Sequence, residues 1–161
     1  VQIFADTFIC EDAVNIMNSS GDISSVIIKN TKFDSLDIDF SDLNIKKINI
    51  ENSLNDCVDI SASKVNITEA VLDTCNDKAF SIGEQSFVKV NNVEVQDSNI
   101  GIAVKDSSEV HIDKLQIIDT NICTAIYRKK QEFGPSKLSV ERLSCTPISK
   151  TYEQLGSEYE N

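Results

Sequence analysis

The sequence predicts an all-β fold, a parallel β-helix (solenoid) of about six coils, each with about 22 residues and three short strands. Three observations lead to this prediction. Branched apolar residues recur every 22 residues, a serine opens a second segment of each repeat, and apolar and polar residues alternate within the segments. An amphipathic helix would place apolar residues at i, i+3, i+4 and i+7, and that spacing is absent. A sandwich of hairpins would show turn signals every ~8–12 residues, but would not repeat one residue type at a fixed longer interval.

The first strand of each repeat carries two columns of residues that are expected to point inward. Every member of one column is a branched aliphatic residue: Ile16, Ile38, Ile60, Ile82, Val104 and Ile126. Two residues earlier, five of six positions are bulky and apolar: Val14, Leu36, Val58, Phe80, Ile102 and, as the exception, Thr124. Because side chains alternate between the two faces of a strand, these columns predict a buried face rich in β-branched residues.

The second strand of each repeat follows a serine, at Ser24, Ser41, Ser63, Ser86, Ser108 and Ser136. Pairs such as Ile48/Ile50 and Val93/Val95 mark the third strand, and asparagines close successive units at Asn55, Asn76, Asn99 and Asn121. Serine and asparagine at fixed turn positions predict hydrogen-bonded ladders along the stack. The spacing slips most at residues 17–25 and 128–135, where longer loops are expected.

We expect residues 1–145 to form a single domain and residues 146–161 to form a tail or loose cap. The first dozen residues supply only part of a coil, so both ends of the stack need a cover, and the chain is expected to be a fragment of a longer one. Neighbouring domains or another subunit are the expected partners at these ends. A net charge of −11 argues against nucleic acid as a partner, and no apolar run of about 18 residues predicts membrane insertion.

Three motifs carry a family resemblance: "DKAFSIGEQS" (77–86), "GIAVKDSS" (101–108) and "YRKKQEFG" (127–134). They resemble a bacterial branch of right-handed parallel β-helix proteins in which these turns and this loop follow one another in successive coils. The resemblance covers residues 56–145 and implies a right-handed, extracellular domain. The broader superfamily is similar to pectate lyases, polysaccharide epimerases and phage tailspikes, in which saccharide lies along the outer face of one sheet. Carbohydrate binding is therefore what the resemblance implies, although a fold does not determine a function.

The outward columns of the first strand supply the candidate site residues. They read Asp37, Asp59, Ser81, Ala103 and Ala125, and beside them Asp39, Ser61, Gly83, Lys105 and Tyr127. The predicted carbohydrate-binding residues are Glu84, Lys105, Asp106, Tyr127, Arg128 and Lys130, the last three in the one basic run of an acidic chain. Alternatively these charges form surface ion pairs, each worth about 0–1 kcal/mol, and the loop is merely solvated, with Phe133 folded back on the core.

Asp37, Asp39 and Asp59 are a candidate calcium site. Neighbours in a column lie about 5 Å apart and i,i+2 positions about 6.6 Å apart, and Ca²⁺ requires several oxygen ligands. With basic residues a few coils away, such a site is similar to the layout that polysaccharide lyases of this fold use. Alternatively the carboxylates serve only to keep the surface soluble.

The histidine and the cysteines form no recognisable motif. The column neighbours of His111 are Asn66, Lys89 and Ser139, so the histidine is expected to be exposed and without a role. Cys57 and Cys123 share a column but lie three coils apart, about 14 Å, too far for a disulfide. The five cysteines are therefore expected to be free and mostly buried.

Three functions remain open at this point: an extracellular binding or spacer domain that faces carbohydrate, a Ca²⁺-dependent polysaccharide lyase or epimerase, and a structural scaffold for protein partners. The sequence does not decide whether the chain is an enzyme.

Overall fold

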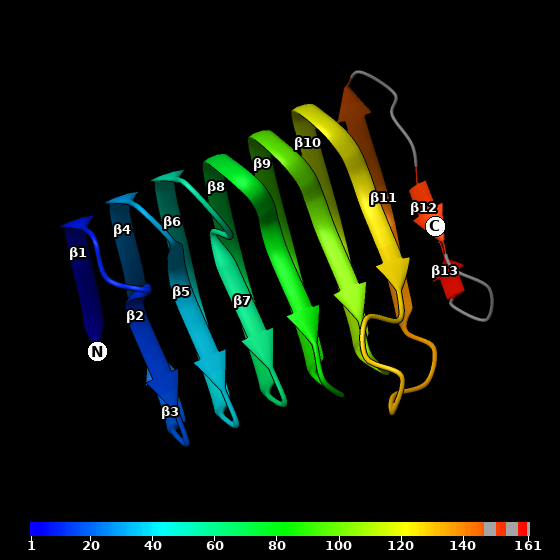
Figure 1. Ribbon diagram of the computed structural model, residues 1–161, viewed down its shortest axis with the longest axis horizontal. Helices are drawn as coiled ribbons and strands as arrows, with labels where there is room; N and C mark the ends of the chain where they lie inside the picture. The colour runs from blue at the N-terminus through cyan, green and yellow to red at the C-terminus, as the bar shows by residue number, and fades with distance from the viewer. Residues whose placement is uncertain (147–150, 154–157, 161) are drawn as a thin grey trace.

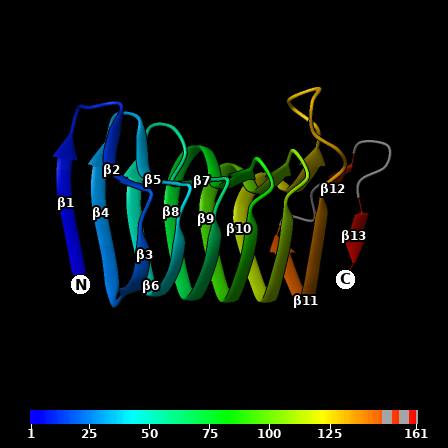
Figure 2. The ribbon, with the colours of Figure 1, turned by 90° about the horizontal axis from the view of Figure 1, so that it is seen from below.

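A computed structural model describes residues 1–146, 151–153 and 158–160, and every strand pairing in it is parallel. The strands are β1 (Gln2–Phe8), β2 (Asp12–Met17), β3 (Ser20–Ile23), β4 (Ser25–Thr31), β5 (Asp34–Asp39), β6 (Asp42–Ser53), β7 (Val58–Ser61), β8 (Lys64–Gly83), β9 (Phe87–Lys105), β10 (Glu109–Tyr127), β11 (Lys137–Thr146), β12 (Thr151–Glu153) and β13 (Glu158–Glu160). The described residues contain no helix that is long and apolar enough to cross a membrane. The predicted all-β solenoid is confirmed, and its coils lie side by side along the long axis (Figures 1 and 2).

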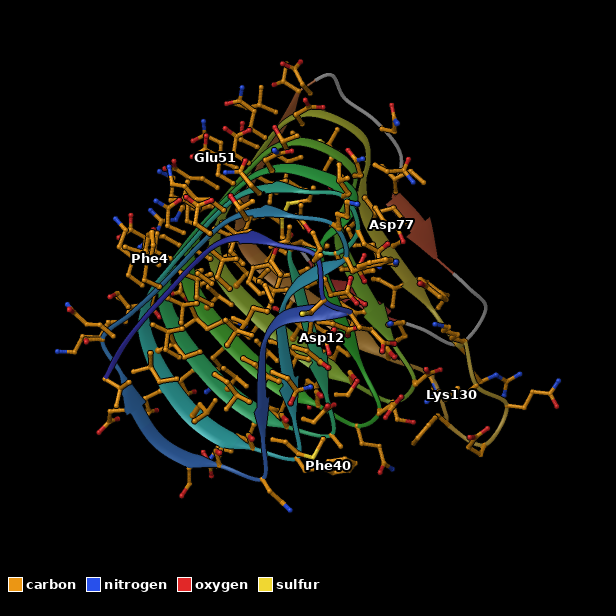
Figure 3. The ribbon with its side chains drawn as sticks, turned by 60° about the vertical axis from the view of Figure 1, so that its left-hand side comes forward. Phe4, Asp12, Phe40, Glu51, Asp77 and Lys130 are labelled. Atoms are coloured by element: carbon orange, nitrogen blue, oxygen red, sulfur yellow. A yellow bond between two sulfur atoms is a disulfide. The ribbon has the colours of Figure 1, made fainter. Side chains whose placement is uncertain are left out.

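The strands form three faces of the stack. The first sheet contains β2, β5, β7 and the last residues of β8, β9 and β10, and the second contains β3 and the first residues of β6 and β8–β11. The third sheet contains β1, β4 and the middle or last residues of β6 and β8–β11. In the oblique view of Figure 3, Phe4 and Glu51 point outward from the third sheet on the left, whereas Phe40 lies at the bottom of the coils.

The three short strands predicted for each coil are joined in the later coils. β8 runs through all three sheets and bends at the corners. It counts as one strand because its residues stay paired with β9 around the corners, except at an irregularity between Cys75 and Lys78. Residues with positive φ make two of the corners: Asn18, Phe40, Ala62, Glu84 with Gln85, and Asp106 with Ser107 after the first sheet, and Thr7, Asn30, Asn52, Thr74, Asp97 and Asp119 after the third. Asn and Asp tolerate this backbone conformation better than most residues, which explains why they recur there.

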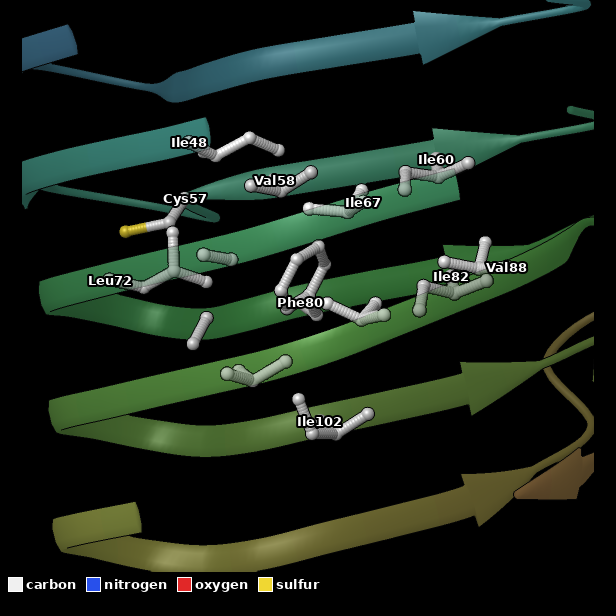
Figure 4. Packing of buried hydrophobic residues seen from close by; sticks show 14 of the residues in the cluster. Ile48, Cys57, Val58, Ile60, Ile67, Leu72, Phe80, Ile82, Val88 and Ile102 are labelled. Carbon is white, nitrogen blue, oxygen red and sulfur yellow. The ribbon is translucent and has the colours of Figure 1, made fainter. Parts of the chain in front are cut away.

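The core lies inside the coils, where the predicted inward columns meet. Val58 pairs with Phe80 and Phe80 with Ile102, in the predicted register. Phe80 is 1% exposed, and its ring lies between these neighbours (Figure 4). Core burial of β-branched side chains in successive coils is the main stabilising contribution to such a stack.

Polar ladders accompany the core at the predicted serines from Ser41 to Ser108. The amide of Ser41 donates to the Ser63 hydroxyl at 2.9 Å, and the amides of Ser63 and Ser86 donate to the hydroxyls of Ser86 and Ser108 at 3.2 Å.

The prediction for Ser24 is wrong, because β4, which follows it, pairs with β6 at Ile48 and Ile50 and belongs to the third sheet. Ser19 continues the serine ladder instead, and β3 supplies the second-sheet strand within the expected loop of residues 17–25.

Asparagine side chains bond to one another near the third corner. Of the predicted positions, Asn121 donates to Asn99 at 3.2 Å, whereas Asn55 donates to Asp34 at 2.7 Å. Asn52 donates to Asn30 at 2.9 Å in a column that was not predicted.

The cysteines contradict the prediction of free thiols. Cys57 is bonded to Cys75 and Cys123 to Cys145, with Cα–Cα distances of 5.5 and 6.3 Å, and Cys10 is free and exposed. The prediction is wrong because it compared only cysteines of one column. Each bond instead joins the first-sheet strand of a coil to the end of the following third-sheet strand, where the coil closes on itself.

The predicted tail continues the stack where it is described. β12 pairs with β10 and β13 with β11, so residues 151–153 and 158–160 extend two of the sheets. The remaining tail residues, 147–150, 154–157 and 161, lie outside the described residues.

Candidate functional site

The candidate site is the outer face of the first sheet, here called the first-sheet face. Its residues align as predicted: Asp37 pairs with Asp59, Asp59 with Ser81, and Lys105 with Tyr127. The early coils contribute carboxylates to this face and the later coils contribute Lys105 and Tyr127.

The later coils of the first-sheet face are far less exposed than the sequence indicated. Ser81 and Ala103 are fully buried, Ala125 is 2% exposed and Lys105 only 7% exposed. The alternative in which Lys105 and Asp106 form surface ion pairs is therefore wrong, because neither side chain lies at the surface.

Asp106 holds the basic loop against the stack. Its carboxylate accepts hydrogen bonds from the amides of Lys129 at 2.7 Å and Lys130 at 2.8 Å. The next residue, Ser107, accepts a hydrogen bond from the amide of Gly134 at 2.6 Å. Asp106 is 1% exposed, so these bonds occupy a carboxylate that the sequence had assigned to carbohydrate.

The other predicted loop residues lie at the rim of the first-sheet face. The Lys130 ammonium pairs with the Glu84 carboxylate, and Figure 3 shows Lys130 on the loop that projects from the stack. Arg128 is exposed, and Tyr127 is half-buried, with burial raising the pKa of its hydroxyl. The structure thus brings Lys105 and Tyr127 onto one face and places Glu84, Arg128 and Lys130 beside it.

The Lys105 side chain is largely buried and has no acidic partner in the described part of the chain. Its ammonium makes no hydrogen bond or ion pair in the described part of the chain. The aliphatic part of the side chain lies over the preceding coil: a Cβ on Gly83 would be 3.3 Å from its Cε and 3.9 Å from its Nζ. The absence of a side chain at Gly83 therefore makes room for the lysine.

Two further polar atoms of the first-sheet face lack partners. Oδ1 of Asp59 and Oγ of Ser81 are buried without a hydrogen bond, and the two residues are direct neighbours in the ladder. Buried polar atoms are usually satisfied, and each unsatisfied one costs about 1–3 kcal/mol. Together with Lys105, they give the face hydrogen-bonding capacity that the chain itself does not use.

The early coils make the other end of the first-sheet face acidic. Burial, followed by repulsion from Asp39 and Asp12, raises the pKa of Asp37 to about 7. The pKa values of Asp12 and Asp34 are raised as well, chiefly by burial. Asp37 accepts one hydrogen bond, from the side-chain amide of Asn15 at 2.9 Å.

The proposed calcium ligands Asp37, Asp39 and Asp59 do not converge on one point. Among the described residues, the group of three whose ligand atoms all lie within 4.8 Å of one another is His111, Asp113 and Glu141. The calcium hypothesis therefore stays a prediction that would require the aspartates to move together.

His111 lies beside two carboxylates that its column neighbours do not include. Its Nε2 lies 3.4 Å from Oδ1 of Asp113 and 3.6 Å from Oε1 of Glu141. The sequence comparison considered only the column of His111 and missed the adjacent column, in which Asp113 and Glu141 are neighbours.

A groove at the first corner was also missed. It has a volume of about 520 Å³, and its lining includes Phe40, Phe87, Asp42 and Lys64. Phe40 is 61% exposed and has a φ of 48°, an unfavourable conformation for a bulky residue. The same positive φ recurs at this corner in the other coils, so it follows from the fold and does not mark the groove.

Comparison with known proteins returned no match: no family model, no curated protein and no solved structure is similar to this chain. The geometry of the faces described above is therefore the basis for a function.

Proposed function

We propose that this chain is an extracellular carbohydrate-binding domain, pectate-lyase-like and of bacterial type, whose first-sheet face binds an acidic polysaccharide. The observation that carries the proposal is the group of unpartnered polar atoms on that face: the Lys105 ammonium, Oδ1 of Asp59 and Oγ of Ser81.

An acidic polysaccharide offers groups that these atoms lack. A uronate carboxylate would pair with the Lys105 ammonium in a charge-assisted bond, which is stronger than a neutral one. Sugar hydroxyls would donate to Asp59, which is only partly buried, whereas Ser81 is fully buried and would have to be uncovered before it could contact a sugar. The ligand would approach over Asp59 and reach Lys105 from the early coils.

The first-corner groove extends this proposed surface. Phe40 and Phe87 line it together with polar side chains, a combination that suits a sugar ring, which has apolar faces and a polar rim.

The two disulfides support the extracellular placement. Disulfides persist in oxidising compartments and are rare in the reducing cytosol. Four of the five cysteines of this chain form them.

Affinity electrophoresis through gels that contain acidic or neutral polysaccharides tests the proposal. We expect an acidic glycan to retard the wild type, and Lys105→Met to abolish the retardation, because methionine keeps an aliphatic chain over Gly83 but has no charge. The matched control is Lys47→Met, which removes an exposed lysine of the third sheet, away from the proposed surface, whose ion pair with Glu69 spans 3.5 Å.

Equal retardation of both variants would refute the assignment of Lys105. If no glycan retards the wild type, the carbohydrate proposal is wrong, and a scaffold that docks protein partners at the ends of the stack becomes the better description.

A second proposal, a Ca²⁺-dependent polysaccharide lyase or epimerase, has one observation in its favour. The carboxylates around Asp37 repel one another, and a bound cation would relieve that repulsion. Lys105 lies three coils from Asp37, about 14 Å away, so the two side chains could not act on one sugar carbon. An unsaturated or epimerised product that a chelator abolishes would support this function, and its absence with every uronate polymer tested would exclude it.

A further inference from the structure

We propose that His111, Asp113 and Glu141 form a binding site for a divalent transition-metal ion at the outer corner between the second and third sheets. The site is separate from the first-sheet face, so the proposal is independent of carbohydrate binding.

The spacing of the three side chains matches a metal centre. A zinc ion lies about 2.0–2.2 Å from nitrogen and oxygen ligands, so two ligands of a tetrahedral site are about 3.3–3.5 Å apart. The imidazole Nε2 is 3.4 Å from the Asp113 oxygen and 3.6 Å from the Glu141 oxygen. The third pair, the two carboxylate oxygens, lies within 4.8 Å.

The same distances are too long for hydrogen bonds. An N–H···O bond in a protein normally spans ~2.7–3.2 Å. Nε2 therefore faces two carboxylates at close range without being bonded to either. A metal ion among the three atoms would use all of them, whereas a proton on Nε2 can be shared well with only one.

No other cation neutralises the two carboxylates. Among the described residues, neither Asp113 nor Glu141 forms an ion pair with a lysine or arginine. Lys89 is in register with His111 on the preceding coil, but its ammonium lies over the Phe87 ring, 5.6 Å from the ring centroid.

The cluster is particular to this part of the stack. In the column of Asp113 and Glu141, the earlier coils carry Lys46, Thr68 and Asn91, none of which is a carboxylate. His111 is the only histidine of the chain, and it lies two residues before Asp113 on the same strand. The side chains are 38–58% exposed, so an ion and its remaining water ligands could reach them.

The backbone around the cluster is well anchored. β10 and β11 are paired from Glu109 to Ile118, and the Cys123–Cys145 disulfide links the same two strands. One imidazole and two carboxylates suit zinc and neighbouring transition metals, whereas Ca²⁺ prefers a larger set of oxygen ligands.

Isothermal titration calorimetry with Zn²⁺ tests the proposal, in a Cys10→Ser background that removes the exposed thiol as a competing ligand. We expect one equivalent of Zn²⁺ to bind at pH 7.5. His111→Gln and Glu141→Gln should each lower the affinity at least about tenfold. Glu109→Gln, an exposed carboxylate on the same strand, should leave the affinity unchanged.

Thermal unfolding and Co²⁺ absorption give independent readouts. Zn²⁺ should raise the Tm of the wild type but not of His111→Gln, whose metal-free Tm shows whether the variant is folded. Co²⁺ should show visible d–d bands that are absent in His111→Gln. The proposal is overturned if Zn²⁺ does not bind, or if it binds equally well to the wild type and to His111→Gln.

Discussion

At the scale of single residues, Asp37 makes the stability of the fold depend on pH. Its pKa is about 7 in the folded protein because of burial and neighbouring carboxylates, against an ordinary value of 3.8. Between about pH 4 and pH 7, the folded state therefore keeps a proton on Asp37 that the unfolded chain has already released. The stabilisation is complete below that window and is lost as the pH rises through about 7.

We expect the Tm to rise as the pH is lowered from 8 to 5, and Asp37→Asn to raise the stability at pH 8 while flattening this dependence. The full shift corresponds to about 4 kcal/mol, but Asp37 is only partly buried, so solvent screening reduces the expected gain to about 1–2 kcal/mol. Urea unfolding at both pH values measures it. The control is Asp97→Asn, which removes an exposed carboxylate at a corner where asparagine also tolerates the positive φ of 53°. A pH dependence unchanged in Asp37→Asn would contradict the prediction.

The burial of Ile60 and Phe80 could be predicted from the sequence, because each lies in a column of apolar residues that recur every 22 residues. The burial of Lys105 could not, since it depends on how the chain covers the outer face and on a glycine one coil away. The contacts of His111 could have been predicted from the sequence. His111 is in register with Ser139, so the positions two residues further along, Asp113 and Glu141, lie beside each other.

At the scale of elements, the loop of residues 128–135 shows a similar limit. Its departure from the repeat is visible in the sequence, but its attachment to Asp106 and Ser107 is not, because both belong to the preceding coil. The motif "GIAVKDSS" thus acquires a structural role: its aspartate and the following serine receive the backbone of the next coil's loop.

We expect Asp106→Gly to release this loop and Asp106→Asn to retain it largely. Both residues tolerate the positive φ of 55° at this position, so the comparison isolates the two hydrogen bonds from backbone strain. The glycine variant should lose about 2–4 kcal/mol, because two buried bonds to a carboxylate are removed. Trypsin, which cleaves after Arg128, Lys129 and Lys130, should cut it faster than the wild type. Equal cleavage of all three proteins would show that the loop is held by other contacts.

At the scale of the whole molecule, each coil contacts only its neighbours, so stability in a solenoid is close to a sum of local terms. The two disulfides lie at different places in the stack: Cys57–Cys75 in an early coil and Cys123–Cys145 near the C-terminal end of the described strands. Their cysteines are separated by 18 and 22 residues. In the chain-entropy description, a disulfide that closes a loop of this size stabilises the fold by about 3 kcal/mol.

Their removal should therefore act locally. We expect the double variant Cys123→Ser/Cys145→Ser to accelerate amide hydrogen exchange in β10 and β11 while leaving β4–β6 near wild-type rates, and Cys57→Ser/Cys75→Ser to affect β7 and β8 first. Each variant is the matched control of the other, because both remove one disulfide and leave no unpaired partner thiol. A uniform acceleration along the whole chain in both variants would instead show that the stack unfolds as one cooperative unit, in which the position of a covalent link does not matter.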